Sequence, residues 1–430
     1  MRYDNLYLWF LADPSAPRYV GQLRLVEAGK GVSLEYGTGW LANGFPVSED
    51  LVLTDIEQLP RWKGMAVGAV DDGRPDRWGE RVIQYLDKPA RLSLMEYLYY
   101  AGDDRFGALG VSTSESAYIP RSTSPLPRLN QAQHLSEVVH KVSANEAVSS
   151  IERQMLSAGG SFGGAKPKGL IDIGGEQWVI KFFDNEPIDL PLIEHASMTL
   201  AKAAGIHVAE TQVVPLTGEN ALIVRRFDRH GLKRMHCISA GTALRAQAIG
   251  GQEPELGYPD LAQLLRRAGV ADQDQNLNDM RELFRRMVFN ILIDNTDDHE
   301  KNHALQVVAP TLQGRYRLAP AYDVLPTNSG AGYQEFIVGA DQRDSTLSNA
   351  MSQCELFGYT PTQAATEVIR VIGVVDGWRD HFAACGVTNP DLESLATRID
   401  GERLLGQRRS FNPAGYATRS SPKRRSPFDR

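Results

Sequence analysis

Apolar positions alternate with polar ones over the first part of the chain and then take up helical spacing. Short alternating runs predict strands at 6–10, 19–25 and 32–36. Helical spacing follows at 91–100, before a glycine-rich turn that leads into a further strand. We therefore expect a separate β-rich N-terminal region over residues 1–117.

A stretch rich in Pro and Ser at 118–129 predicts a linker, and a second mixed region follows it at 130–230. The elements expected there are helices at 130–156 and 192–204 and strands at 169–173, 177–183, 212–216 and 221–225. Gly205 is expected to cap the second of these helices.

From about residue 260 onwards most of the chain has helical periodicity, which predicts a mostly helical region over 231–405. One short strand is expected within it at 316–318. The tail at 406–430 contains Arg, Ser and Pro with few apolar residues, so we expect it to be basic and disordered.

Composition limits the class of protein but does not identify a function. The 430 residues are 42% hydrophobic and 23% charged, and the net charge of -7 does not indicate direct nucleic-acid binding. Three widely separated cysteines predict reduced thiols, and no stretch of the sequence has the length and apolarity of a membrane span. We expect a cytoplasmic protein without a membrane partner.

The densest candidate chemistry lies at 293–302, where acids, a histidine, a lysine and an amide follow a helical segment. Asp297 precedes Asn302 by five positions, and Asp323 follows a short strand later in the chain. This is the order in which protein kinases place their catalytic base and their two magnesium ligands. Oxygen donors of this kind are what Mg²⁺ prefers.

Upstream residues fit the same order. The glycine-rich run at 159–168 brings backbone N–H groups close to phosphates, and Lys181 ends a predicted strand as the phosphate-binding lysine of kinases does. Glu194 begins the next helix and is expected to pair with Lys181. Residues 225–227 follow a strand and predict the hinge that grips adenine. Taken singly, each of these features is ordinary.

Two overlapping motifs suggest other chemistry. His299 and His303 form an H-E-x-x-H match, which binds zinc only when both histidines lie on one face of a helix, and turn-forming residues precede it here. Residues 159–163 match the G-x-S-x-G nucleophile elbow, which requires a strand before it, whereas the preceding segment has helical spacing.

The ordered set predicts an α+β, bilobal protein-kinase-like fold, with the β-rich accessory region in front and a mostly helical C-terminal lobe. The chain also resembles the HipA-like serine/threonine kinases of bacterial toxin–antitoxin modules. The matching motifs are Ser-x-Gly-Gly-Ala-x-Pro-Lys at 161–168, Ile-Lys at 180–181, Arg-Phe-Asp-Arg at 226–229, Asn-Thr-Asp-Asp-His-x-x-Asn at 295–302 and Pro-x-Tyr-Asp at 320–323. The accessory region is similar through Pro-Asp-Arg-Trp-Gly at 75–79 and Asp-Asp-Arg-Phe-Gly-Ala at 103–108.

The resemblance implies ATP-dependent phosphorylation of a protein serine or threonine, with Mg²⁺ held by Asn302 and Asp323 and with Asp297 as the base. The nucleotide-binding residues that it implies are Gly163, Gly164, Ala165, Lys166, Lys168, Lys181, Glu194, Arg225, Arg226, Phe227, His299, Lys301, Asn302, Tyr322 and Asp323. Arg225 departs from the pattern, because some relatives carry an acidic residue at this hinge position.

The resemblance further implies a translation component as target, such as an aminoacyl-tRNA synthetase, and a growth-arresting toxin. It implies a small helix-turn-helix antitoxin as partner, with operator DNA bound mainly through that antitoxin. Ser161 matches the serine that relatives autophosphorylate to switch themselves off. Two alternatives stay open at this point: a small-molecule phosphotransferase, and a kinase-fold binding module with weak catalysis.

Overall fold

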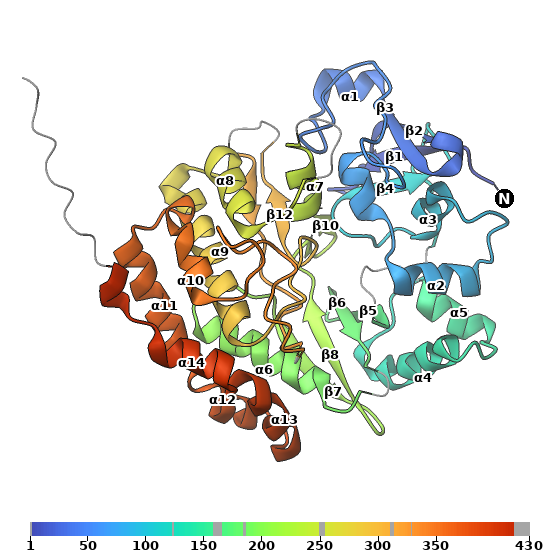
Figure 1. The fold of residues 1–430 in the computed structure, drawn as a ribbon. Coiled ribbons are helices and arrows are strands. Elements are labelled where there is room, and N and C mark those ends of the chain that lie inside the picture. Colours follow the sequence, from blue (N-terminus) through green and yellow to red (C-terminus); the bar gives the residue numbers. More distant parts are fainter. Residues whose placement is uncertain are drawn as a thin grey trace, which may run out of the picture.

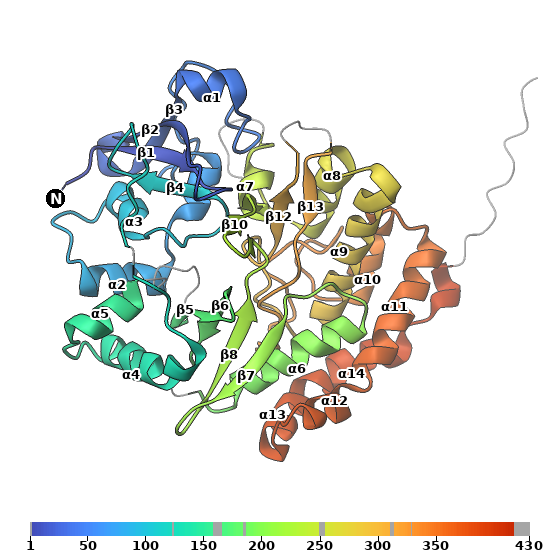
Figure 2. The ribbon, with the colours of Figure 1, turned by 180° about the vertical axis from the view of Figure 1, so that it is seen from behind.

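The computed structural model describes residues 2–122, 124–157, 166–183, 186–248, 254–309, 314–327 and 329–416. Figures 1 and 2 show a β-rich N-terminal region, a central antiparallel sheet and a helical C-terminal part that lies on the other side of that sheet. The mixed, bilobal fold class predicted from the sequence is confirmed.

The N-terminal region is built on a four-stranded antiparallel sheet in the order β3-β2-β1-β4. Its strands and helices are β1 (Asn5–Phe10), β2 (Arg18–Val26), β3 (Gly31–Tyr36), β4 (Leu109–Ser112), α1 (Thr38–Asn43), α2 (Arg77–Leu86) and α3 (Leu94–Tyr100). Leu6 and Leu8 of β1 are buried on the same face, as the alternation predicts. The three strands expected at the start of the chain are therefore present.

The central region carries a second antiparallel sheet in the order β5-β6-β8-β7. Its elements are α4 (Ala132–Ser143), α5 (Ser150–Ser157), β5 (Lys168–Ile173), β6 (Glu176–Lys181), α6 (Leu190–Ala203), β7 (Thr211–Pro215) and β8 (Asn220–Arg225). Helix α6 packs on β7 and β8, while the predicted helix at 130–156 is broken into α4 and α5. Gly205 adopts a φ of +73° after α6, as expected of its cap.

The rest of the chain is mainly helical and includes a small three-stranded sheet in the order β11-β12-β13. Its elements are β9 (Arg229–His230), β10 (Lys233–Arg234), β11 (Cys237–Ser239), α7 (Ala240–Arg245), α8 (Tyr258–Ala268), α9 (Gln275–Leu292), β12 (Ala304–Val307), β13 (Tyr316–Leu318), α10 (Leu347–Ser352), α11 (Pro361–Val375), α12 (Trp378–Ala384), α13 (Asn389–Ile399) and α14 (Glu402–Ser410). Strand β13 confirms the one predicted at 316–318. Helix α9 packs against α8 and α11 and ends where the acid-rich segment begins.

The N-terminal region shares its hydrophobic core with the remainder of the chain. Its sheet belongs to the same buried cluster as α6, α8 and α9. Trp78 and Val82 of α2 instead join the core formed by α4, α5 and the central sheet. The N-terminal region therefore packs against both the helical C-terminal part and the central region.

The expectation of a disordered tail from residue 406 is wrong for its first part, because α14 continues to Ser410. The Arg408 guanidinium is buried and lies 2.8 Å from both Asp376 and Asp400. These ion pairs stabilise a helix that its polar composition did not predict. The prediction of disorder for residues 417–430 falls outside the described part of the chain.

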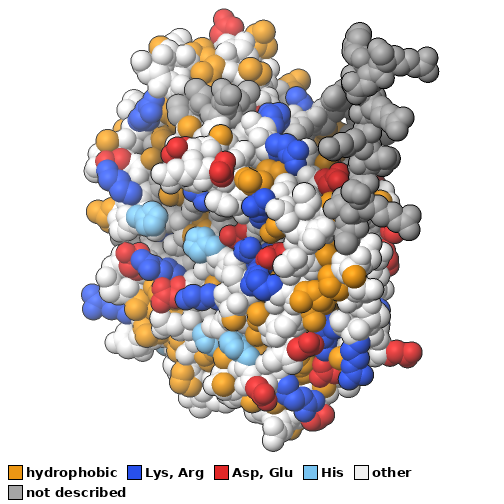
Figure 3. Space-filling model, turned by 90° about the vertical axis from the view of Figure 1, so that its left-hand side faces the viewer, with side chains coloured by type: hydrophobic (Ala, Val, Ile, Leu, Met, Phe, Trp, Pro, Cys, Tyr) orange, Lys and Arg blue, Asp and Glu red, His pale blue; other side chains and the backbone are white. Residues whose placement is uncertain are grey.

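Figure 3 shows acidic and basic side chains interspersed on the face that it draws. Among the described residues, no helix combines the length and apolarity needed to cross a bilayer.

Candidate active site

Lys181 lies at the centre of the site, at the end of β6, where it is 7% exposed. Its Nζ donates to Glu194 Oε1 and to Asp323 Oδ1, each at 2.6 Å. The predicted pairing of Lys181 with Glu194 is therefore confirmed, and it joins β6 to α6. The contact with Asp323, 142 residues away, brings the helical part of the chain to the same point.

Opposite charges stabilise one another in this cluster. Burial favours the neutral forms, but Asp323 and Glu194 outweigh it and hold the pKa of Lys181 above its usual value. Burial likewise opposes the charge of Asp323, yet Lys181 and Lys168 hold its pKa below the usual range. Lys168 at the start of β5 is 8% exposed, and burial together with the charge of Lys181 lowers its pKa to about 8. The site thus presents two lysines to one acidic loop.

The segment that follows α9 is held in place by Asp294, which sequence analysis did not single out. Asp294 is fully buried and adopts a φ of +61°, a conformation that Asp tolerates better than most residues. Its Oδ1 accepts from Arg403 at 2.6 Å, and its Oδ2 accepts from the Gly330 N–H at 3.1 Å. Nothing in the local sequence links Arg403 to this loop, because the contact spans 109 residues.

Asp297, the predicted base, is partly exposed on this loop. Partial burial, with repulsion from Asp323 and Glu335, raises the pKa of Asp297, and His299 opposes the rise. A higher pKa makes a carboxylate a better proton acceptor. Asn302 is 8% exposed, and its Nδ2 donates to the Asp297 carbonyl at 3.4 Å. The two predicted residues are therefore linked across one turn.

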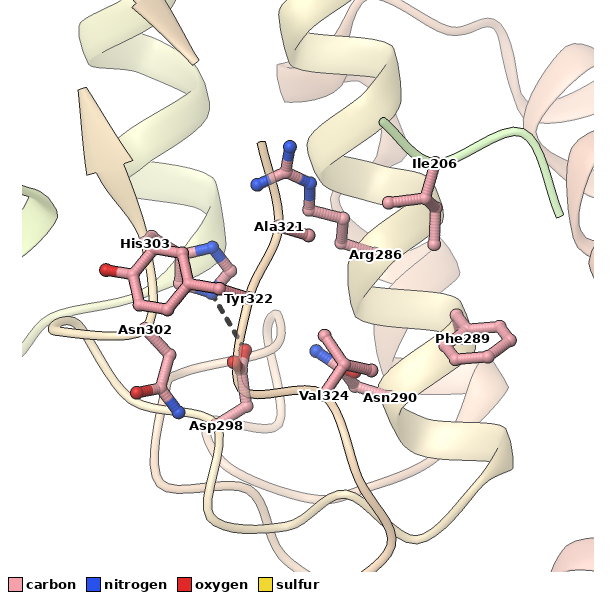
Figure 4. Close-up of a pocket in the computed structure, with 10 residues that line it drawn as sticks. All are labelled: Ile206, Arg286, Phe289, Asn290, Asp298, Asn302, His303, Ala321, Tyr322 and Val324. Atoms are coloured by element: carbon pink, nitrogen blue, oxygen red, sulfur yellow. Dashed lines mark hydrogen bonds and ion pairs between the residues drawn. The ribbon is translucent and has the colours of Figure 1, made fainter. Parts of the chain in front are cut away.

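Asp298 is buried and points towards His303, in a network of buried side chains (Figure 4). It lies 2.8 Å from His303 Nε2 and accepts from the Tyr258 hydroxyl, which in turn accepts from Asn290 at 3.2 Å. Burial opposes the charge of Asp298, but His303 and Tyr258 keep its pKa low. The cavity beside this network measures about 10 Å³, far less than a nucleotide needs. We therefore infer that this network holds the loop at 293–303 in place and does not bind a nucleotide.

The local structure does not fit the zinc motif or the hydrolase motif. Residues 293–303 form turns, so His299 and His303 do not lie on one helical face. Within the described residues, no group of three or more His, Cys, Asp or Glu side chains is arranged to hold a metal. Helix α5 precedes the G-x-S-x-G match, where a nucleophile elbow requires a strand.

Asp323 also adopts a left-handed conformation, with a φ of +58°. The preceding residue, Tyr322, donates from its hydroxyl to the Lys301 carbonyl at 2.5 Å. The Asp323 side chain is 44% exposed, so its carboxylate is accessible from the site. Asn302 and Asp323 supply hard oxygen donors on neighbouring loops, which is the donor chemistry that Mg²⁺ accepts.

The predicted hinge begins at Arg225, which closes β8 and pairs with Glu176 at 3.4 Å and Glu210 at 3.5 Å. Arg226 is buried, and its guanidinium donates to both Asp228 oxygens at 2.9 Å. Its backbone N–H donates to Gln177 at 3.1 Å. The side chain and the backbone N–H of Arg226 therefore bond within the protein, and its contact with a nucleotide stays a prediction.

The aromatic ring of Phe227, the last hinge residue, packs at 5.5 Å from the ring of Tyr322. Lys166 lies beside the site, 2.6 Å from Glu186 and over the ring of Phe183. Four predicted residues lie outside the described part of the chain: Ser161, Gly163, Gly164 and Ala165.

Comparison with known proteins identifies the family of this chain. The family described as "HipA-like C-terminal domain" matches residues 160–378, about half of the chain, and the chain belongs to this family. The resemblance proposed from the motifs is thereby confirmed.

Curated relatives include "Putative kinase Y4dM" of Sinorhizobium fredii, 31% identical over 165 residues, and a "Putative kinase" of Haemophilus influenzae, 28% identical over 141 residues. The matched segments cover 36% and 30% of this chain, and 38% and 39% of the respective relatives. The chain therefore matches less than two-fifths of either relative's length.

Among solved structures, the chain is similar to a HipA from Shewanella oneidensis MR-1 whose structure is described as a complex with HipB and its operator DNA. The similarity covers 94% of this chain and 98% of that one, with a TM-score of 0.63 and 16% identity. At this level of identity the comparison establishes the shared fold.

Proposed function

We propose that this protein is an ATP- and Mg²⁺-dependent serine/threonine-protein kinase that acts as the toxin of a HipA/HipB-like module. The observation that carries the proposal is the Lys181 ammonium, which bridges Glu194 on α6 and Asp323 on the later loop at 2.6 Å each. Kinases use a Lys–Glu pair and a metal-binding Asp in this relation to position the nucleotide phosphates.

In the proposed reaction, the substrate hydroxyl oxygen attacks the γ-phosphorus of ATP, and the bond to the β–γ bridging oxygen breaks to release ADP. Asp297 accepts the hydroxyl proton, which the raised pKa of its carboxylate favours. Lys181 and Lys168 stabilise the negative charge on the phosphate oxygens. Asn302 and Asp323 would hold Mg²⁺, which would supply positive charge at the phosphate oxygens.

The biological setting is proposed from the family and from the related structure solved with HipB and operator DNA. We propose a small helix-turn-helix antitoxin as partner, operator contact mainly through that antitoxin, and a translation component such as an aminoacyl-tRNA synthetase as substrate. We also propose that Ser161 is autophosphorylated. A phosphoserine carries roughly -1.5 to -2 charge at neutral pH and would repel ATP from the glycine-rich segment.

The test compares wild type with Asp297→Asn, which keeps the side-chain shape but removes the proton acceptor. Purified protein is incubated with Mg²⁺ and γ-labelled ATP, the label transferred to protein measures activity, and mass spectrometry shows whether the Ser161 peptide carries the phosphate. We expect transfer by wild type and a loss on the order of 10²–10⁴-fold in the variant, with ATP binding retained. Equal transfer by the two proteins would remove Asp297 as base, and an unmodified Ser161 in an active enzyme would remove self-inactivation.

A further inference from the structure

Helix α2 begins at an aspartate whose side chain does not cap the helix. Asp76 occupies the N-cap position, where an Asp side chain usually accepts from the first turn, yet it makes no such bond. Its Oδ1 instead lies 2.9 Å from Nζ of Lys301, 225 residues away on the catalytic loop. The N-terminal region thus contacts the loop between the predicted base, Asp297, and the predicted metal ligand, Asn302.

The same helix also holds the other side of the site. Trp78, two residues after Asp76, is 3% exposed, and its Nε1 donates to the Lys168 carbonyl at 2.8 Å. Lys168 starts β5, the strand that leaves the glycine-rich segment, and its charge interacts with Asp76 and Asp323. A single turn of α2 therefore connects the phosphate-binding strand to the catalytic loop.

Lys301 is held at two points. Its side chain pairs with Asp76, and its carbonyl accepts from the Tyr322 hydroxyl at 2.5 Å. Tyr322 precedes Asp323, so the backbone of Lys301 links the two loops that carry the predicted metal ligands. A shift of Lys301 would move Asn302 directly, because the two residues are adjacent.

An aromatic contact from the N-terminal region reaches the same loops. Phe106 packs edge-on against Phe227 with ring centroids 6.2 Å apart, and Phe227 packs against Tyr322 at 5.5 Å. Phe106 and Asp76 come from the two motifs at 103–108 and 75–79, to which the predicted chemistry gave no role. The motif at 75–79 therefore contacts Lys301 directly, and the motif at 103–108 reaches it through Phe227 and Tyr322.

From these contacts we infer that Asp76 is a positioning residue for phosphoryl transfer, which it serves by holding Lys301 and with it the catalytic loop. The inference rests on the proposed kinase function. The ion pair is partly exposed, with side-chain exposures of 46% for Lys301 and 30% for Asp76, so its contribution to overall stability is small. Its effect falls on the chemical step, because small displacements of catalytic groups slow reactions strongly.

The experiment uses the full chain and compares wild type with Asp76→Asn and Asp76→Glu. Asn is as good an N-cap residue as Asp, so Asp76→Asn removes the charge without weakening the start of α2. The matched control is Asp13→Asn, which removes another partly exposed ion pair between the N-terminal region and the rest of the chain, to Lys233. Hydrogen exchange of peptide 293–303 reports order in the loop, and steady-state kinetics report transfer.

For Asp76→Asn we expect about threefold faster exchange in the loop peptide. We also expect a roughly tenfold lower kcat, with KM for ATP within about twofold of wild type. Asp76→Glu should recover most of both, and Asp13→Asn should match wild type. The inference is overturned if Asp76→Asn exchanges at the wild-type rate, or if its loop exchanges faster while kcat stays unchanged. If wild type itself transfers no phosphate, the proposed function fails, and the exchange comparison still decides whether Asp76 holds the loop.

Discussion

At the scale of single residues, the site is a set of charges that compensate one another before any nucleotide binds. Lys181 forms ion pairs with Glu194 and Asp323 at the same distance. Glu194 is fully buried and belongs to α6, whereas Asp323 is half-exposed and belongs to a loop. A metal ion with bound phosphates would therefore be coordinated by Asp323, while the ion pair with Glu194 would keep Lys181 in place.

This difference predicts the effect of Asp323→Ala. The variant loses an oxygen ligand and leaves Lys181 paired with Glu194, so the protein should fold but bind Mg²⁺-ATP poorly. We expect transfer to fall on the order of 10²–10³-fold, as for other losses of one charge-stabilising group. Calorimetric titration of ATP with and without Mg²⁺ measures the binding. Asp341→Ala, which changes an exposed acid of the same lobe, is the control, and Mg²⁺-dependent binding equal to wild type in Asp323→Ala would contradict the assignment.

Sequence order was enough to predict that Lys181 pairs with Glu194, because the strand-to-helix spacing is local. The contacts of Lys181 with Asp323, and of Lys301 with Asp76, were not predicted. They join segments 142 and 225 residues apart, and their existence depends on how whole regions pack. Asp76 did lie in a motif that had been noted, whereas Arg403 carried no signal at all.

At the scale of elements, α6 matters because its first two turns carry Glu194. The helix is capped by Asp189, whose Oδ1 accepts from the Leu192 N–H at 3.1 Å. The other oxygen of Asp189 accepts from Asn220 at 2.6 Å, which ties the cap to β8. The start of α6 is therefore fixed to the central sheet by one side chain.

Asp189→Ala should cost about 1 kcal/mol of stability, the usual effect of losing an N-cap. It should also lower transfer severalfold, because fraying of the first turn loosens Glu194 and through it Lys181. Thr388→Ala removes the cap of α13, far along the chain from the site, and is expected to cost similar stability while activity stays at the wild-type level. Unfolding curves and initial rates of both variants make the comparison. Equal activity losses in the two variants would show that Asp189 acts only through general stability.

Most elements of the central sheet were predicted to within one or two residues, because their apolar alternation is regular. The second half of helix α14 was missed, since its Arg-rich sequence is stabilised by Asp376 and Asp400, which directly follow α11 and α13. The break between α4 and α5 was also missed. Pattern arguments work where an element buries a periodic face and fail where distant charges stabilise it.

At the scale of the whole molecule, a buried polar joint connects the N-terminal region to the segment after β8. Asp228 accepts from the Gly107 N–H at 2.8 Å and pairs with both Arg226 and Arg229 at 2.9 Å. Burial opposes the Asp228 charge, but the two arginines keep its pKa well below the usual range. Gly107 adopts a φ of +74°, and a Cβ there would lie 2.9 Å from the Cys237 carbonyl. Close packing at this joint therefore requires glycine.

His236 lies at the same boundary and gives it a dependence on pH. The imidazole is 4% exposed, packs against the rings of Phe10 and Phe45, and its Nε2 bonds to the Val47 carbonyl at 2.8 Å. That carbonyl accepts from Nε2–H, and the buried Nδ1 has no hydrogen-bond partner among the described residues, so a second proton there would lie in the interior without an acceptor. Burial lowers the pKa of His236 to about 4, and the nearby Arg315 adds to the effect.

The direction of the pH effect follows from the two states. The unfolded chain binds a proton at His236 with a pKa near 6.5, whereas the folded protein does so only near 4, so the unfolded state takes up the proton first. The stability linked to this residue is complete above about pH 6.5 and is lost as the pH falls towards 4. Between pH 7 and pH 5 the loss should be about 2 kcal/mol.

His236→Gln retains a donor for the Val47 carbonyl but does not titrate, so its stability should fall less over the same range. Urea unfolding of both proteins at pH 7 and pH 5 measures how much free energy of unfolding each loses. The other titrating groups are the same in the two proteins, so their contribution cancels when the two losses are subtracted. An identical pH dependence in the two proteins would mean that His236 is protonated without cost in the folded state, and that this boundary is insensitive to acid.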